Sequence, residues 1–162
     1  IPSCVVAIGD YAFDGCSMLV QILIPSSVNT IGNSIFTGCL SLTEVSLPSS
    51  VTSLGNHIFS GCSSLTNVVL PSNIDSIGKY TFSGCSSLTD VTIPKTVKII
   101  DDYAFSGCTS LKKLIIPSSV NTIGDYTFSG CTALEQMPLP DSIDSIGENA
   151  FKDVKIHKNI EF

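Results

Sequence analysis

The stretch FTGCLSLTEVSLPSSVTSLGNHIFSGCSSLTNVVLP, from Phe36 to Pro71, contains nearly the same pattern twice. Each copy has a phenylalanine, a Gly-Cys pair, a leucine and a short apolar alternation that ends at proline. Such self-similarity is examined before local structure, because a fixed period determines the architecture of a repeat protein. Phe36 and Phe59 are 23 residues apart, as are Cys39 and Cys62. The stretch therefore predicts a 23-residue repeat.

The 23-residue step extends over the whole chain of 162 residues. One unit reads P-x-x-[VI]-x-x-[IL]-G-x-x-x-F-x-G-C-x-x-L-x-x-[VIM]-x-[IL], and about seven units fill residues 1–162, which leaves no room for a second domain. Three of the repeated columns are Phe13, Phe36, Phe59, Phe82, Phe105, Phe128 and Phe151; Pro2, Pro25, Pro48, Pro71, Pro94, Pro117 and Pro140; and Cys16, Cys39, Cys62, Cys85, Cys108 and Cys131.

Two local periods alternate within each unit. The Val-Ser-Leu alternation at 45–47 predicts a short strand of about 4 residues, and the following proline ends it because proline cannot donate to a ladder. The spacing from Gly32 to Phe36 is closer to helical, which predicts one helical or 3₁₀ turn with a side-chain cap. We expect positive φ at the glycine that opens this turn and at Asp101, which replaces it in the fifth unit.

A single unit cannot be stable alone. Its roughly seven inward residues contribute about 10–20 kcal/mol of burial, whereas ordering one unit costs on the order of 35 kcal/mol. Stacking adds parallel hydrogen bonds at a spacing of about 4.8 Å and a continuous interior. The repeat therefore predicts a solenoid roughly 30–35 Å long, in which cysteine serves as a small buried hydrophobe.

The composition excludes several classes of function. The net charge is −6 and arginine is absent, which argues against a nucleic-acid partner. No apolar run approaches the roughly 20 residues that a membrane span needs, so we expect no membrane insertion by this segment. The chain begins in the middle of the repeat pattern, and we interpret it as a fragment of a longer protein whose signal lies elsewhere.

The motif L-x-x-[VI]-x-[IL]-P followed by [IL]-G-x-x-x-F-x-G-C, as in Leu65–Pro71 and Ile123–Cys131, resembles the BspA-like, or treponemal-type, leucine-rich repeat. The resemblance covers essentially the whole chain. It implies a right-handed repeat solenoid with short parallel β-strands on the concave face and helical or 3₁₀ turns and loops opposite. It also implies a surface or secreted protein that acts in adhesion and host interaction, without catalytic residues or a cofactor.

Six of the seven cysteines share one column. We expect no catalytic thiol, because the six cysteines are equivalent and none is distinguished as a nucleophile. A catalytic thiol would also need a histidine within reach, and of the two histidines His57 lies on the helical side and His157 in the last unit. We expect no metal site, because thiols in a straight column do not converge. Stacking in register would strain a disulfide between neighbours, so we expect these thiols to be buried and reduced. Cys4 falls on a polar corner, as a free thiol or as the partner in an intermolecular disulfide.

The outward side of the strands is the candidate binding surface. Its two columns alternate with the buried Val and Leu positions and vary in chemistry, whereas the interior columns scarcely change. This contrast favours recognition of another surface, although neutral drift on an unused face would produce it too. Exposed aliphatic residues there favour binding, because they can anchor a partner. The candidate ligand-binding residues are Gln21, Leu23, Glu44, Ser46, Asn67, Val69, Asp90, Thr92, Lys113, Ile115 and Gln136.

Three further features have two interpretations each. The column that runs from Tyr80 to Tyr126 is either half-buried packing or a sugar-binding stripe. The last unit departs from the pattern at Asp153, Val154 and His157, and is either a cap-like terminal repeat or simply divergent. A basic cluster in the fifth unit either is solvated or docks an acidic patch, and it consists of Lys95, Lys98, Lys112 and Lys113.

These observations predict a non-catalytic binding module on the cell surface or in a secreted protein. We expect its concave strand face to bind a protein or a glycan on another cell or in the extracellular matrix, since a rigid array loses little entropy on binding. The alternative is a structural spacer, or stalk, whose repeats display another domain of a larger surface protein.

Overall fold

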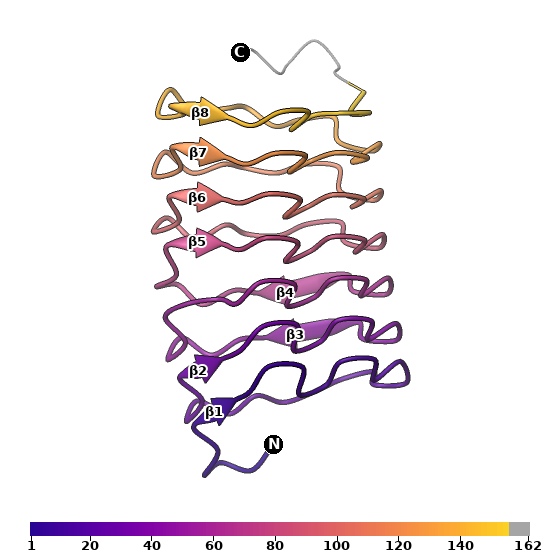
Figure 1. The fold of residues 1–162 in the computed structure, drawn as a ribbon, viewed down its shortest axis with the longest axis vertical. Helices are drawn as coiled ribbons and strands as arrows, with labels where there is room; N and C mark the ends of the chain where they lie inside the picture. Colours follow the sequence, from indigo (N-terminus) through magenta and orange to yellow (C-terminus); the bar gives the residue numbers. More distant parts are fainter. Residues whose placement is uncertain (156–162) are drawn as a thin grey trace.

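The computed structural model describes residues 1–155 as a stack of coils, each made by one 23-residue unit (Figure 1). We number the coils from one to seven, so that coil one begins at Pro2 and coil seven at Pro140. Figure 1 shows the coils lying one above another along the longest axis of the molecule. The repeat solenoid with short parallel strands is confirmed, whereas its handedness and the concavity of its strand face stay predictions.

The described residues contain eight short strands and no helix. They form three parallel sheets, in the orders β1-β2, β3-β4 and β5-β6-β7-β8. Each strand pair joins residues 23 positions apart, so identical positions of successive coils lie side by side. The strands are β1 (Ala7–Ile8), β2 (Thr30–Ile31), β3 (Glu44–Ser46), β4 (Asn67–Val69), β5 (Ser76–Ile77), β6 (Ile99–Ile100), β7 (Thr122–Ile123) and β8 (Ser145–Ile146).

The strands belong to two strips that run along the stack. The Thr-Ile strip contains β1, β2 and β5 to β8. The Val-x-Leu strip contains β3, β4 and the bridges Gln21–Glu44 and Lys113–Gln136. The arrows of the two strips point in opposite directions in Figure 1, because each coil turns at the proline corner between them. The Val-x-Leu strip consists of residues 21–24, 44–47, 67–70, 90–93, 113–116 and 136–139.

The sequence pattern predicts only one of these two strips. The alternation at 45–47 predicts the Val-x-Leu strip, and β3 and β4 confirm it. The Thr-Ile strip is not predicted, because each of its strands has only two residues, too few for an alternation to be visible. Hydrogen bonds such as Gly32 N–H to the Ile8 carbonyl oxygen, at 2.9 Å, nevertheless join its coils.

The described residues have no helix where the helical or 3₁₀ turn is expected, and the 3₁₀ turn stays a prediction. The segment carries a ladder of backbone hydrogen bonds between coils, which we name the turn ladder. Tyr103, Phe105 and Gly107 of coil five donate their N–H groups to carbonyl oxygens 22 residues ahead, at 2.8–2.9 Å. Phenylalanines of the column donate in this way at all six junctions between coils, at 2.7–2.9 Å. Alternate residues can all point their N–H groups along the stack because φ is positive at Tyr103 (56°) and at Gly107 (74°).

The expected positive φ at the first glycine of each unit, and at Asp101, is wrong. Positive φ falls two residues later, in the column of Tyr103, and again at the second glycine of the unit. The first glycine is required for space instead. A Cβ atom at Gly124 would lie 2.6 Å from Asp102 Oδ1 and 2.5 Å from the Asp102 backbone nitrogen of the preceding coil, closer than atoms pack.

The core consists of the repeated apolar columns. The rings of Phe36, Phe59 and Phe82 are fully buried and stack with centroids 5.5–5.6 Å apart. Cysteine fits beside them because its thiol has a partner: Cys62 Sγ donates to the Phe36 carbonyl oxygen at 3.0 Å. The same bond recurs at Cys39, Cys85, Cys108 and Cys131. In residues 1–155, every buried side-chain nitrogen or oxygen has a hydrogen-bond partner.

The two ends of the stack depart from the expected pattern. Cys16 was expected in the interior with its column and is exposed, because coil one is covered from one side only. Cys4 is exposed, as its polar corner predicts. In coil seven, Val154 replaces the cysteine and is buried. The expected cap falls largely on residues 156–162, including His157, which lie outside the described residues.

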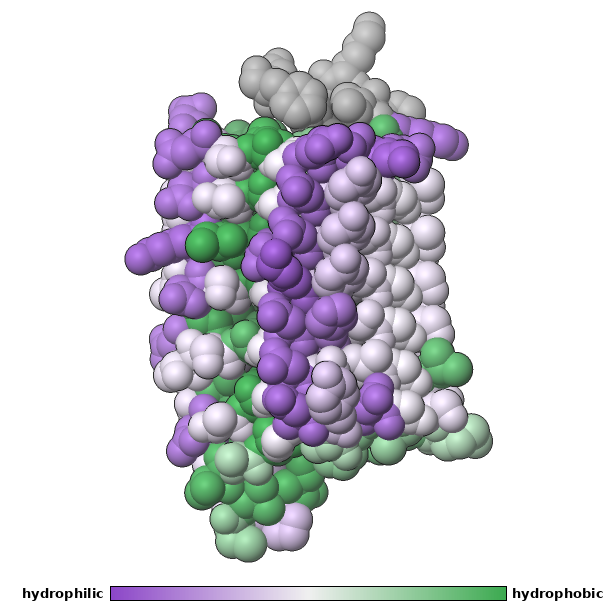
Figure 2. All heavy atoms as spheres, in the orientation of Figure 1, coloured by the Kyte–Doolittle hydropathy of each residue, from purple (hydrophilic) through white to green (hydrophobic). Residues whose placement is uncertain are grey.

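The surface repeats as regularly as the core. Figure 2 shows columns of similar hydropathy running along the length of the stack, with hydrophilic columns beside more neutral ones. This follows from the pairing, which places residues 23 positions apart next to each other. A difference between neighbouring units at a surface position therefore produces a local change within an otherwise uniform column.

Candidate binding surface

The eleven candidate ligand-binding residues all lie on the Val-x-Leu strip and are all exposed. Between them, Val45, Val68 and Val91 are buried, as the alternation requires. Leu23 and Ile115 expose 78% and 62% of their surface, which is high for aliphatic side chains. The structure thus brings these residues together on one surface; that this surface binds a ligand stays a prediction.

Three hollows follow one another along this strip. The first, of about 430 Å³, spans coils one to three and is lined by Leu23, Glu44 and Val69 among others. The second, of about 310 Å³, lies between coils three and four. The third, of about 670 Å³, lies between coils four and five and is lined by Asp90 and Ile115 among others. Of the eleven candidate residues, ten line one of these hollows, and Gln136 lies beyond them.

The strand ladder of this strip is interrupted at coil four. Residues 44–46 and 67–69 pair as β3 and β4, and Lys113 pairs with Gln136. Among the described residues, the backbone groups of 89–93 make no hydrogen bond to either neighbouring coil. Residues 90–93 of this segment line the third hollow and residues 90–92 also line the second, so their backbone groups lie beside the hollows and are not used in a ladder.

Charge changes sign along the strip. Glu44 and Asp90 are acidic, and Gln21 donates a hydrogen bond from Nε2 to Glu44 Oε1 at 3.2 Å. Lys113 follows in the next coil, and it lines the third hollow together with Lys95. Two members of the basic cluster, Lys98 and Lys112, are exposed but do not line this hollow. The cluster is therefore divided between the hollow and the surface around it.

The sequence pattern does not identify the whole lining of the third hollow. Lys95, Pro117 and Ser119 line it, although they belong to the corners that follow the strip and not to its outward columns. Lys95 could have been identified through the basic cluster. The serines of the corner carry no distinguishing signal, because serine occupies this corner in most units.

The cysteine column is poorly suited to nucleophilic chemistry. Burial raises the pKa of Cys39 to about 11 and that of Cys62 and Cys131 to about 12. Burial also raises the pKa of Cys85 and Cys108 well above the ordinary value. The reactive thiolate is therefore scarce at neutral pH. In the described part of the chain, no three metal-binding side chains come together.

The tyrosine column forms an aromatic stack on the turn ladder. The rings of His57, Tyr80, Tyr103 and Tyr126 lie parallel, with centroids 4.6–4.9 Å apart. These four residues are half-buried, so each ring covers its neighbours and leaves mainly its edge to solvent. The geometry favours packing over a sugar-binding stripe, because a sugar needs an open ring face.

Comparison with protein families matches the BspA type Leucine rich repeat region, in six copies over residues 1–112 and 53–162. The chain therefore belongs to the BspA-type leucine-rich repeat family. No curated protein matches the chain. Across residues 1–155, no helix is long and apolar enough to cross a membrane.

Solved structures of bacterial proteins share the fold. A leucine-rich repeat protein from Bacteroides ovatus is 34% identical with a TM-score of 0.74, and the match covers 91% of this chain and 44% of that one. A leucine-rich repeat protein from Eubacterium ventriosum is 31% identical with a TM-score of 0.89, over 98% and 43% of the two chains. A leucine rich cell surface protein from Faecalibacterium prausnitzii is 26% identical with a TM-score of 0.51, over 95% and 63%. The chain spans less than half the length of the first two relatives.

Proposed function

We propose that this protein is a non-catalytic binding module of a cell-surface or secreted protein, and that the Val-x-Leu strip is its binding surface. The observation that carries the proposal is the contrast between a uniform interior and eleven exposed, chemically diverse side chains. Ten of these line hollows on the same strip. The name of the related Faecalibacterium prausnitzii cell surface protein supports the proposed location.

The mechanism is recognition by a preformed surface. Backbone ladders and buried columns fix the positions of the exposed side chains before a partner arrives, so binding costs little additional order. Leu23, Val69 and Ile115 supply apolar contacts, and the charged residues between them supply orientation and selectivity. We expect a protein or a glycan of another cell or of the extracellular matrix as the partner.

The test is a pull-down from extracellular-matrix and cell-surface extracts with two matched triple variants. Val69→Ser/Lys113→Ser/Ile115→Ser removes two exposed aliphatics and one lysine from the Val-x-Leu strip. The control Lys98→Ser/Ile99→Ser/Ile146→Ser also removes two exposed aliphatics and one lysine, but from the Thr-Ile strip and the residue that precedes β6. We expect the first variant to lose the captured partner and the second to retain it. Capture that neither variant alters would contradict the proposal and favour the spacer.

A further inference from the structure

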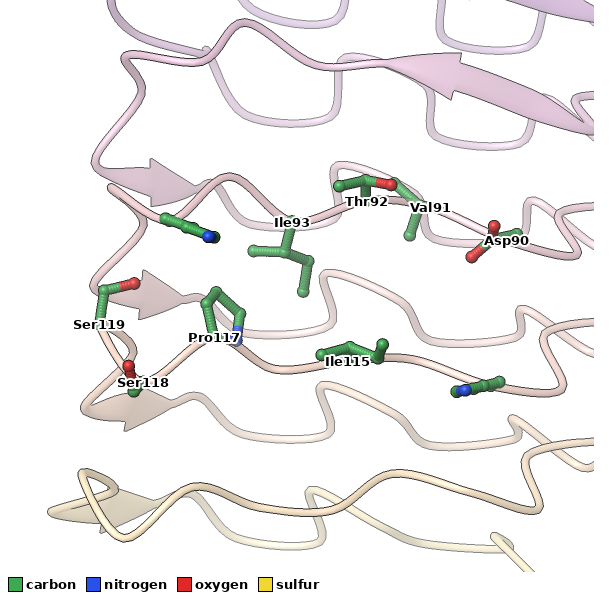
Figure 3. A pocket seen from close by; sticks show the side chains of 10 residues that line it. Asp90, Val91, Thr92, Ile93, Ile115, Pro117, Ser118 and Ser119 are labelled. Atoms are coloured by element: carbon green, nitrogen blue, oxygen red, sulfur yellow. The ribbon is translucent and has the colours of Figure 1, made fainter.

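The third hollow differs from the rest of the Val-x-Leu strip in both size and chemistry. Figure 3 shows Asp90, Thr92 and Ile93 of coil four facing Ile115 of coil five and Pro117, which follows it at the start of coil six, with the hollow between them. Its volume of about 670 Å³ falls within the range of ligand-binding pockets. It could therefore admit one or two side chains of a bound partner, and the other two hollows are smaller, at about 430 and 310 Å³.

The interrupted ladder gives this hollow free hydrogen-bonding groups. In a parallel ladder, N–H and C=O groups point along the stack toward the neighbouring coils. The groups of residues 90–93 have no partner there, because no bridge joins this segment to residues 113–116. A polar group that enters the hollow from solvent can thus reach backbone groups of residues 90–93 that are not already bonded to a neighbouring coil. The side chains of Val91 and Ile93, which are buried, form its apolar floor.

The charge at the hollow is opposite to that of the whole chain. The chain has a net charge of −6, yet Lys95 and Lys113 line the hollow and Asp90 is its one acidic lining residue. A carboxylate in the hollow can accept hydrogen bonds from backbone N–H groups and pair with a lysine, a combination stronger than either contact alone. Ile115, largely exposed at the rim, offers an apolar contact to a neighbouring side chain.

We propose that the hollow between coils four and five is a subsite for a protein ligand, and that it receives an Asp or Glu side chain of an extended segment with an aliphatic or aromatic residue beside it. The inference rests on the proposed binding function and adds the chemistry of the partner. A protein segment fits better than an acidic sugar, because no aromatic ring lines the hollow and its apolar lining is aliphatic.

The test begins with selection of a random phage-displayed 12-residue peptide library on the purified chain. We expect enrichment of Asp or Glu next to Ile, Leu, Val or Phe. A synthetic peptide from the selection, labelled with fluorescein, is then titrated by fluorescence anisotropy. Lys95→Glu/Lys113→Glu should weaken its binding at least about tenfold, since charge-assisted hydrogen bonds are lost. The matched control Lys98→Glu/Lys112→Glu changes the charge equally beside the hollow and should stay within about threefold.

Several results would overturn the subsite. They are the absence of any enriched peptide, enrichment without acidic residues, or equal losses in the two double variants. Acidic oligosaccharides that bind in place of peptides, with the same sensitivity to Lys95→Glu/Lys113→Glu, would replace the protein ligand by a glycan. If the Val69→Ser/Lys113→Ser/Ile115→Ser variant loses partner capture while Lys95→Glu/Lys113→Glu retains it, the binding surface stands and the acidic subsite falls. If no variant alters capture, the proposed function itself falls.

Discussion

A reciprocal exchange of two residues at the junction of coils four and five tests how the coils are held in register. At the five other junctions, an Asp or Asn accepts a backbone hydrogen bond from the next coil, as Asp102 Oδ1 does from Asp125 N–H at 2.9 Å. The residue before that N–H in the next coil is glycine, because this oxygen and backbone atoms of the preceding coil lie too close to the place that a Cβ atom would take. The same contacts recur at Asp10–Asn33, Asn33–Asn56, Asn56–Lys79 and Asp125–Glu148.

Coil four has Lys79 at the Asp/Asn position, and coil five has Asp101 at the glycine position. Lys79 has no acceptor to offer, and Asp101 Oδ1 instead accepts the hydrogen bond of the Asp102 N–H at 2.8 Å. Lys79 Nζ reaches Asp102 Oδ2 at 2.6 Å. We infer that the two departures from the repeat are linked: without an Asp or Asn side chain in coil four, one of the close contacts to a Cβ atom in coil five is removed.

The magnitudes follow from these contacts. Asp101→Gly removes a hydrogen-bond acceptor and gives the unfolded chain more conformational freedom, so we expect it to lower the free energy of unfolding by about 1–2 kcal/mol. Lys79→Asn brings an amide to the Asp101 Cβ, and the corresponding distances at Gly78 and Gly124 are 2.7 and 2.6 Å. The overlap should cost about 1–3 kcal/mol. The double variant restores the contacts of the other junctions and should lie close to the wild type, so the coupling energy is about 2–5 kcal/mol, the sum of the two single losses.

The assay is urea unfolding followed by circular dichroism for the wild type, both single variants and the double variant. The reverse exchange at the preceding junction is the control: Gly78→Asp should be strongly destabilising, and adding Asn56→Lys should recover part of the loss. Additive effects of Lys79→Asn and Asp101→Gly, within about 0.5 kcal/mol, would refute the proposed steric and hydrogen-bonding link between the two positions.

Three further outcomes follow from the same structure. At pH 8, a thiol reagent should modify Cys4 and Cys16 in the folded protein and all seven cysteines after unfolding in urea; rapid native labelling of more than two would contradict the buried column. Burial raises the pKa of Cys62 and Cys131 from 9.0 to about 12, which favours the protonated folded state. Their contribution to stability is therefore complete below pH 9.0 and lost as the pH rises toward 12, by about 1.4 kcal/mol per pH unit for each thiol. Cys62→Ala/Cys131→Ala should have a shallower alkaline loss in denaturant titrations, and an unchanged slope would contradict this account. Gly124→Ala should lower the free energy of unfolding by about 2–4 kcal/mol, whereas Gly9→Ala, with no atom within 4 Å of the added Cβ, should have little effect; equal losses would contradict the steric explanation.

The sequence predicts the parts of this fold that depend on repetition. The columns of Phe59 and Cys62 and the outward side of β3 and β4 follow from a 23-residue period combined with alternation. The turn ladder could not be predicted, because the spacing from the first glycine to the phenylalanine, as from Gly32 to Phe36, is close to helical and the positive φ angles are not visible in the sequence. The sequence suggests backbone freedom as the reason for the glycine column. The structure shows that space is the reason, because the atoms that exclude a Cβ atom at Gly124 belong to the preceding coil, for example to Asp102, which is 22 residues away.

The candidate surface was predictable as a set of residues and not as a shape. The segment Asp-Val-Thr-Ile at 90–93 has the same alternation as Glu-Val-Ser-Leu at 44–47, yet only the latter belongs to a hydrogen-bonded ladder. The difference lies in whether the segment pairs with the neighbouring coils. No local pattern records that pairing, so the hollows and their lysine lining become visible only in three dimensions.

The turn ladder explains why the coils stay stacked although the Val-x-Leu strip is unpaired at coil four. Phe59 and Phe82 donate backbone hydrogen bonds to the next coil at 2.9 and 2.7 Å, on the two sides of the coil whose strip is unpaired. The buried rings and thiols repeat across the same junctions. Cohesion between coils therefore comes from the interior and from the turn ladder, whereas pairing on the strip is present at some junctions and absent at others. A strip that is not needed for cohesion can change its side chains and its spacing, and both changes are what a recognition surface requires.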